Sequence, residues 1–198
     1  MAMKILIDNG HGYNTPGKCS PDGRLREYKY SREIAAALCD ELKAQGYDAE
    51  LIVTESYDVS LRQRTQRVNA ICRKLGASNV LLVSIHCNAA GSDGRWHTAQ
   101  GWSAHVSLNA SQRSKNLAGY LADAAKAAGL KVRLQRPGQS YWPQNLAICR
   151  DTNCAAVLTE NLFQDNRDDV DYLLSDAGRK AIVGLHRTGI LNYIKQTK

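Results

Sequence analysis

A chain of 198 residues, of which 43% are hydrophobic, can fill one hydrophobic core, so we expect a single domain covering residues 1–198. Its formal net charge of +7 at pH 7 favours an anionic partner, such as a nucleic acid, an acidic membrane surface or a wall polymer with carboxylates and phosphates. We exclude nucleic acid, because only 7% of the residues are aromatic and the basic residues are scattered rather than clustered.

The sequence contains no uninterrupted apolar stretch long enough to cross a bilayer, so we expect no membrane insertion. Its first residues lead directly into a short apolar run without the apolar core of an export signal, which predicts synthesis in the cytoplasm. The six cysteines include no C-x-x-C pair, and Cys39 and Cys72 fall inside helical patterns, as small buried residues would. We therefore expect reduced thiols, and we expect a monomer.

Short apolar runs, typical of buried strands, alternate along the chain with segments whose apolar residues recur every three to four positions, typical of helices. In chain order we expect a strand at 4–7, a loop at 8–26, a helix from Glu27 that ends at Gly46, a strand at 47–54, a helix from Ser60 that ends at Gly76, strands at 80–85 and 102–106, a helix at 111–128, a loop at 137–146, a strand at 155–159 and a helix at 176–193. This alternation predicts an α/β fold with a mostly parallel central sheet and helices on both faces.

Polar side chains follow three of the expected strands. His11, His86 and Glu160 each come at or soon after the end of a separate apolar run, and a parallel sheet gathers such strand ends at one rim. Glu27 joins them if the loop before it folds back over that rim. Two histidines and a glutamate are a common catalytic zinc set that leaves a fourth position for water, so we expect zinc at His11, Glu27 and His86. Glu160 is then free to take the proton of that water.

Each of these residues also has an ordinary explanation. A single histidine at a strand end is more often structural, and Glu27 in a first helical turn complements the helix dipole. Glu160 is more informative, because a carboxylate beside a buried run is unfavourable unless it is paired or functional. Their convergence on one rim favours the functional interpretation. The remaining histidines, which we assign to structural roles, are His97 in a loop, His105 in an edge strand and His186 in the final helix.

Five sequence blocks together carry a family resemblance. They are IDNGHG at 7–12, Glu27 at the start of its helix, LRQRTQRVN at 61–69, SIHCNA at 84–89, and VLTENLF at 157–163 with Asn166 following. In order and spacing they resemble the zinc-dependent N-acetylmuramoyl-L-alanine amidases of the type 3 family, across nearly the whole chain. The resemblance implies zinc at His11, Glu27 and His86, a catalytic Glu160, and hydrolysis of the bond between N-acetylmuramic acid and L-alanine in peptidoglycan.

The sequence also departs from the pattern of that family. Gly12 is followed by Tyr13 where the family has further glycines, which predicts a different loop shape near the metal. Residues 89–100 are too few for the inhibitory helix of members that are regulated at cell division. The chain is therefore similar to an unregulated catalytic domain that acts on the cell wall, as a phage or prophage lysin does.

Two neighbours of His86 need separate assignments. Strand alternation points Cys87 away from His86, so we interpret it as a buried residue and not as a nucleophile. We expect Asn88 to help shape the site.

Two other function classes remain open. A related α/β zinc carboxypeptidase would need an arginine clamp for a terminal carboxylate, and no arginine is singled out for that role. A non-catalytic wall binder with the same fold would lack a ligand or the catalytic glutamate, and all four residues are present. The amidase, with peptidoglycan as its partner, is therefore the preferred prediction.

Overall fold

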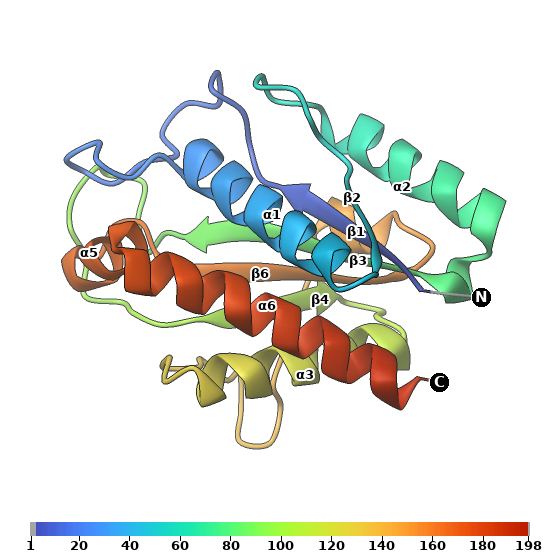
Figure 1. Cartoon of the computed structure of the whole chain (residues 1–198). Helices are drawn as coiled ribbons and strands as arrows, with labels where there is room; N and C mark the ends of the chain where they lie inside the picture. Colours follow the sequence, from blue (N-terminus) through green and yellow to red (C-terminus); the bar gives the residue numbers. More distant parts are fainter. Residues whose placement is uncertain (1–2, 198) are drawn as a thin grey trace.

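The computed structural model describes residues 3–197, so Met1, Ala2 and Lys198 lie outside it. In these residues a six-stranded sheet has the strand order β2-β1-β3-β6-β4-β5 (Figure 1). The elements are β1 (Lys4–Asn9), α1 (Glu27–Ala44), β2 (Asp48–Leu51), α2 (Leu61–Leu75), the 3-10 turn η1 (Ala77–Asn79), β3 (Val80–Asn88), β4 (Ser103–Ser107), α3 (Gln112–Ala127), β5 (Trp142–Gln144), α4 (Ala147–Arg150), β6 (Ala155–Phe163), α5 (Arg167–Leu174) and α6 (Asp176–Gln196).

The sheet is mostly parallel, as predicted. β2, β1, β3 and β6 run in one direction, whereas β4 pairs antiparallel with β6 and carries β5 parallel to itself. Figure 1 shows α1, α3 and α6 over one face and α2 over the other. The α/β fold with helices on both faces is therefore confirmed, and the carboxyl ends of the four parallel strands lie at one rim.

Strand alternation divides the core into two layers. In β3, Ile85 and Cys87 pack into the larger core under α1, α3 and α6, whereas Leu82 packs into the smaller core under α2 and α4. His86 alternates with Cys87 and so belongs to the opposite side of the strand. This confirms that Cys87 points away from His86.

The first two helices begin and end where local signals predict. α1 is followed by Gly46 with φ 81°, and α2 by Gly76 with φ 84°. Ser60 and Gln63 form both hydrogen bonds of a capping box at the start of α2. These boundaries follow from residues within one turn of each helix end.

Several predicted boundaries need correction. The strand at 47–54 is only Asp48–Leu51, while β3 and β6 continue past His86 and Glu160, because their pairing extends to Asn88 and Phe163. The register shifts between His86 and Asn88, and Leu162 takes a φ of 64°, which marks a bulge beside the rim.

Four further elements, η1, β5, α4 and α5, were not expected from the sequence. The predicted loop at 137–146 contains β5, which pairs with β4, so His105 does not lie in an edge strand. α5 follows Asn166, whose side chain caps the helix by accepting a hydrogen bond from the Asp169 backbone N–H.

Candidate metal centre

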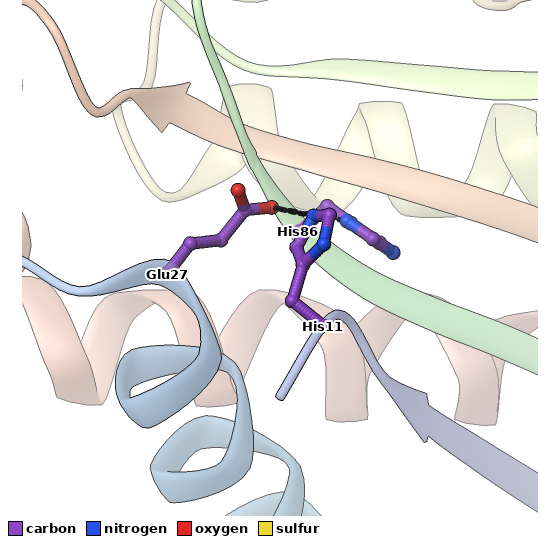
Figure 2. A group of neighbouring side chains, drawn as sticks. All are labelled: His11, Glu27 and His86. Carbon is purple, nitrogen blue, oxygen red and sulfur yellow. Dashed lines mark hydrogen bonds and ion pairs between the residues drawn. The ribbon is translucent and has the colours of Figure 1, made fainter. Parts of the chain in front are cut away.

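Three of the predicted site residues meet at the carboxyl rim of the sheet. His11 lies just after β1, Glu27 is the first residue of α1, and His86 lies near the end of β3. Figure 2 shows their side chains converging, and one potential ligand atom from each lies within 4.8 Å of the others. The two imidazole rings meet edge to face, with centroids 4.9 Å apart. The loop before Glu27 does fold back over the rim, as the zinc prediction required.

The backbone around His11 is unusual. His11 has a φ of 61°, a left-handed conformation that is uncommon for residues other than glycine and often marks functional sites. Glycines on both sides permit close packing: a Cβ at Gly10 would lie 2.3 Å from Cε1 of His86, and a Cβ at Gly12 would lie 1.9 Å from the Asp58 backbone nitrogen. Tyr13, in contrast, is 61% exposed and its backbone N–H binds the carbonyl of Ser56.

Arg64 of α2 binds the backbone around His11. Arg64 is only 2% exposed, and its guanidinium lies 2.6 Å from Oδ1 of Asp8. It donates further hydrogen bonds to the carbonyls of Val59, Asn9 and His11 and to the carboxylate of Asp58. Sequence reasoning placed Arg64 in a family block but assigned it no role. The signal that would reveal it is an arginine on the side of α2 that also carries the buried Thr65 and Val68.

Glu27 is the most deeply buried member of the cluster. It is 1% exposed, and its Oε1 lies 3.0 Å from Nδ1 of His86 and 3.3 Å from Nε2 of His11. The same oxygen accepts a hydrogen bond from the Cys87 backbone N–H at 3.0 Å. Burial alone would raise the pKa of Glu27, but its hydrogen bonds with the two histidines hold that pKa well below the usual range. Glu27 is therefore a carboxylate.

The donor set fits a divalent cation. Glu27 Oε2 is buried and has no hydrogen-bond partner among residues 3–197, so the carboxylate retains an unused acceptor. Burial would lower the pKa of His86, yet the hydrogen bond and negative charge of Glu27 raise it, so the carboxylate attracts positive charge to this point. Two imidazoles and a carboxylate are a donor set that zinc prefers.

Glu160 lies beside the cluster on the neighbouring strand. It is paired in register with His86, so both side chains project to the same face of the sheet. Its Oε2 is buried and has no hydrogen-bond partner among the described residues. Burial raises the pKa of Glu160 to about 7; the charge on His86 opposes this rise, whereas Glu27 adds to it. A carboxyl group with this pKa can exchange a proton near neutral pH.

The other histidines lie outside the cluster and have local partners. His97 binds Asp93 at 2.9 Å, and His105 binds the hydroxyl of Ser103 at 2.9 Å. His186 lies between the hydroxyl of Thr159 and the carbonyl of Ile182, and burial lowers the pKa values of His105 and His186 to about 4. These contacts agree with the structural roles predicted for all three.

The two neighbours of His86 also have their own surroundings. Cys87 is 4% exposed, and burial raises the pKa of its thiol well above the usual value, so it is a poor nucleophile. All six cysteines are free thiols. The Asn88 side chain accepts a hydrogen bond from the Ala89 backbone N–H and makes none with the three clustered residues.

Comparison with known proteins gives a consistent result. The profile of a family described as N-acetylmuramoyl-L-alanine amidase matches residues 5–192. An endolysin of Bacillus phage SPP1 is 26% identical over 200 residues, covering 100% of this chain and 68% of the relative. The N-acetylmuramoyl-L-alanine amidase CwlM of Bacillus licheniformis is 29% identical over 199 residues, covering 99% of this chain and 70% of the relative.

Solved structures show the same fold. An N-acetylmuramoyl-L-alanine amidase from Clostridium difficile 630 superimposes with a TM-score of 0.83 at 24% identity, covering 98% of this chain and 97% of that one. The catalytic domain of CwlV from Bacillus (Paenibacillus) polymyxa var. colistinus gives a TM-score of 0.80 at 22% identity, with 98% of each chain covered.

Proposed function

The chain belongs to the N-acetylmuramoyl-L-alanine amidase family, and on that premise we propose that it cleaves the bond between muramic acid and L-alanine with zinc at His11, Glu27 and His86 and Glu160 as the general base. The observation that carries the proposal is the convergence of His11, Glu27 and His86, which we call the triad. The Glu27 carboxylate in it keeps a buried Oε2 that has no hydrogen-bond partner among residues 3–197. When bound there, zinc would act as a Lewis acid toward the scissile carbonyl and lower the pKa of water.

Glu160 is well placed to move protons in this reaction. As a carboxylate it takes a proton from the attacking water, and as an acid it returns that proton to the departing alanine nitrogen. A group that performs both steps needs a pKa near the working pH, and the burial of Glu160 supplies one of about 7. Its lack of a hydrogen-bond partner within residues 3–197 leaves Oε2 available for this exchange.

Peptidoglycan is the proposed partner, and the setting is that of a lysin acting on the cell wall. The net charge of +7 suits an anionic wall polymer. Among residues 3–197 no helix has the length and apolar character needed to span a membrane. All four proposed site residues come from one chain, so a monomer suffices.

The test compares Glu160→Gln with Glu27→Gln. Glutamine preserves the shape of glutamate but removes the basic oxygen, so Glu160→Gln should keep zinc and lose about a hundredfold to ten-thousandfold of the amidase rate. Glu27→Gln should lose zinc as well as rate, because a neutral amide is a poorer zinc ligand. Metal analysis and hydrolysis of purified peptidoglycan measure both. Undiminished activity of Glu160→Gln would refute its role.

The products identify the bond that is cleaved. An amidase releases peptides that begin with L-alanine and leaves the disaccharides intact, whereas a carboxypeptidase shortens the peptide from its other end. Mass spectrometry of a digest separates these outcomes. Binding of the wall without any released peptide would identify a non-catalytic binder.

A further inference from the structure

A cavity whose lining includes Lys18, Arg95 and Gln164 lies beside the loop that leads to Glu27, and we propose that it holds the stem peptide of the substrate by its free carboxylates, through Lys18 and Arg95. The cavity has a volume of about 380 Å³ and lies between loop 16–21 and loop 89–95, with Gln164 and Asp165 also in its lining. This inference rests on the proposed function, because it assigns one part of the amidase substrate to one side of the metal centre.

Backbone contacts connect this cavity to the triad. The carbonyl of Lys18 accepts a hydrogen bond from the Glu27 backbone N–H at 2.9 Å, and Cys19 forms a bridge with Arg26. The loop that carries Lys18 is therefore fastened beside the first turn of α1.

Loop 89–95, on the opposite side of the cavity, is also held by hydrogen bonds. Asp165 Oδ2 accepts hydrogen bonds from the backbone N–H groups of Ala90 and Gly91, and its own carbonyl accepts one from His97. These contacts hold both ends of the loop that carries Arg95. Arg95 is therefore presented by a tethered loop.

The cavity contains binding groups without partners. Among residues 3–197, neither the Lys18 ammonium nor the Arg95 guanidinium makes an ion pair. Asp165 in the same lining binds two backbone N–H groups through Oδ2, and its Oδ1 is buried without a partner in this part of the chain. Gln164 is 2% exposed, and its Oε1 has no donor within the described part of the chain. Two cations and a buried acceptor match a ligand that has carboxylates and N–H groups.

The chemistry of peptidoglycan selects the peptide as this ligand. In the intact substrate the lactyl carboxyl group is already part of the scissile amide, so the sugars beside it carry no charge. The stem peptide has a free α-carboxylate on its D-glutamyl residue, next to the alanine, and peptide N–H groups throughout.

A second cavity, which two of the triad residues line, differs from the first cavity in chemical character. It has a volume of about 340 Å³ and its lining includes His11 and His86 together with the apolar side chains of Leu61, Leu146 and Ile148. No residue lines both cavities. Its charged groups, Asp8, Asp58 and Arg64, pair with one another and offer no free cation. The carboxylate-bearing side of the substrate therefore belongs in the Lys18 cavity.

A single exposed thiol in this cavity supplies a binding assay that does not depend on turnover. Cys19 lines the cavity and is exposed, whereas the other five cysteines are buried. The probe is the soluble peptide L-Ala-γ-D-Glu-L-Lys, and the readout is the rate of Cys19 alkylation by N-ethylmaleimide, followed by mass spectrometry. At a peptide concentration about ten times its dissociation constant, alkylation should slow about tenfold. The same peptide with D-isoglutamine in place of D-glutamate, which lacks the α-carboxylate, should protect less.

Variants complete the test. The double variant K18Q/R95Q should weaken protection by about tenfold. Protection is measured as the ratio of the Cys19 alkylation rates with and without peptide, because this ratio cancels any direct effect of K18Q on the reactivity of Cys19. K180Q removes an exposed positive charge on α6, outside the cavity, and should behave as the parent does. Absence of protection at millimolar peptide, equal protection by the isoglutamine peptide, or unchanged protection in K18Q/R95Q would overturn the proposal. None of these readouts needs catalysis. If the protein is inactive but the peptide still protects Cys19, the proposed function is refuted and the proposed peptide site is not.

Discussion

Replacing Arg64 with methionine tests whether the proposed metal centre depends on the buried ion pair between Arg64 and Asp8. Arg64 and Asp8 are both buried, with 2.6 Å between guanidinium and carboxylate, and the same guanidinium binds the carbonyl of His11 at 3.2 Å. Removing one partner of such a pair typically costs about 3–5 kcal/mol, because the other charge stays buried and uncompensated. In a domain of this size that loss lowers the melting temperature by about 6–20 °C.

The Arg64→Met substitution should also weaken zinc binding. Without Arg64 the backbone at His11 loses its fixed position, and disruption of groups that orient metal ligands typically weakens metal affinity about ten- to a hundredfold. Arg64→Lys keeps the charge for Asp8 but not the planar fork, so it should retain more stability than the methionine variant while still binding zinc more weakly.

Thermal melts of the metal-free proteins and zinc titration against a chromophoric chelator measure the two effects. Arg113→Met is a matched control, since Arg113 also donates to backbone carbonyls, those of Ala77 and Ser78, but meets no buried carboxylate. It should cost less than about 1 kcal/mol. If Arg64→Met melts and binds zinc like the Arg113 control, the buried pair does not support the site.

Three further predictions address individual site residues. Gly10→Ala should lose zinc and activity, because the new Cβ would lie 2.3 Å from the ring of His86. Gly184→Ala in α6 is the control: a Cβ there meets no neighbouring atom within 4 Å, so a thermal melt should show unchanged or slightly higher stability. In the metal-free protein the folded state holds the Glu160 proton more tightly than the unfolded chain does. The free energy of unfolding of the parent, relative to that of Glu160→Gln, should therefore fall by about 3 kcal/mol as pH rises from 4.5 to 7. If urea titrations show that this difference does not change with pH, the pKa of about 7 is contradicted. Cys87→Ala should keep most of its amidase rate, and loss of activity comparable to that of Glu160→Gln would restore the thiol as a candidate nucleophile.

The parts of the fold that sequence predicts well are those with local signals. The start and end of α2 follow from the capping box at Ser60 and from Gly76, all within a few residues of the helix ends. The apolar run of β3 is long enough to indicate a doubly covered strand. His11 and His86 were recognised for a related reason, because a polar side chain near the end of such a run stands out from its neighbours.

The parts that sequence missed depend on long-range partners. β5 is three residues long and exists because Trp142 pairs with His105, a contact that no local pattern encodes. The register shift next to His86 arises only when β3 meets β6. Arg64 is a similar case: its position beside Thr65 and Val68 can indicate that it is buried, but not that its guanidinium reaches the loop after β1.

The proposed division of roles between the two glutamates also rests on their surroundings and not on their sequence positions. Glu27 Oε1 faces two imidazoles and the Cys87 N–H, which together keep it ionised, as a ligand for a cation must be. Glu160 is half-buried, and its Oε2 is buried without a partner within residues 3–197, so ionisation is unfavourable and the pKa is raised to about 7. A group that must accept a proton and then release it needs this intermediate affinity. Exchanging the two environments would exchange the two roles, because the same side chain changes its charge only where its neighbours allow it.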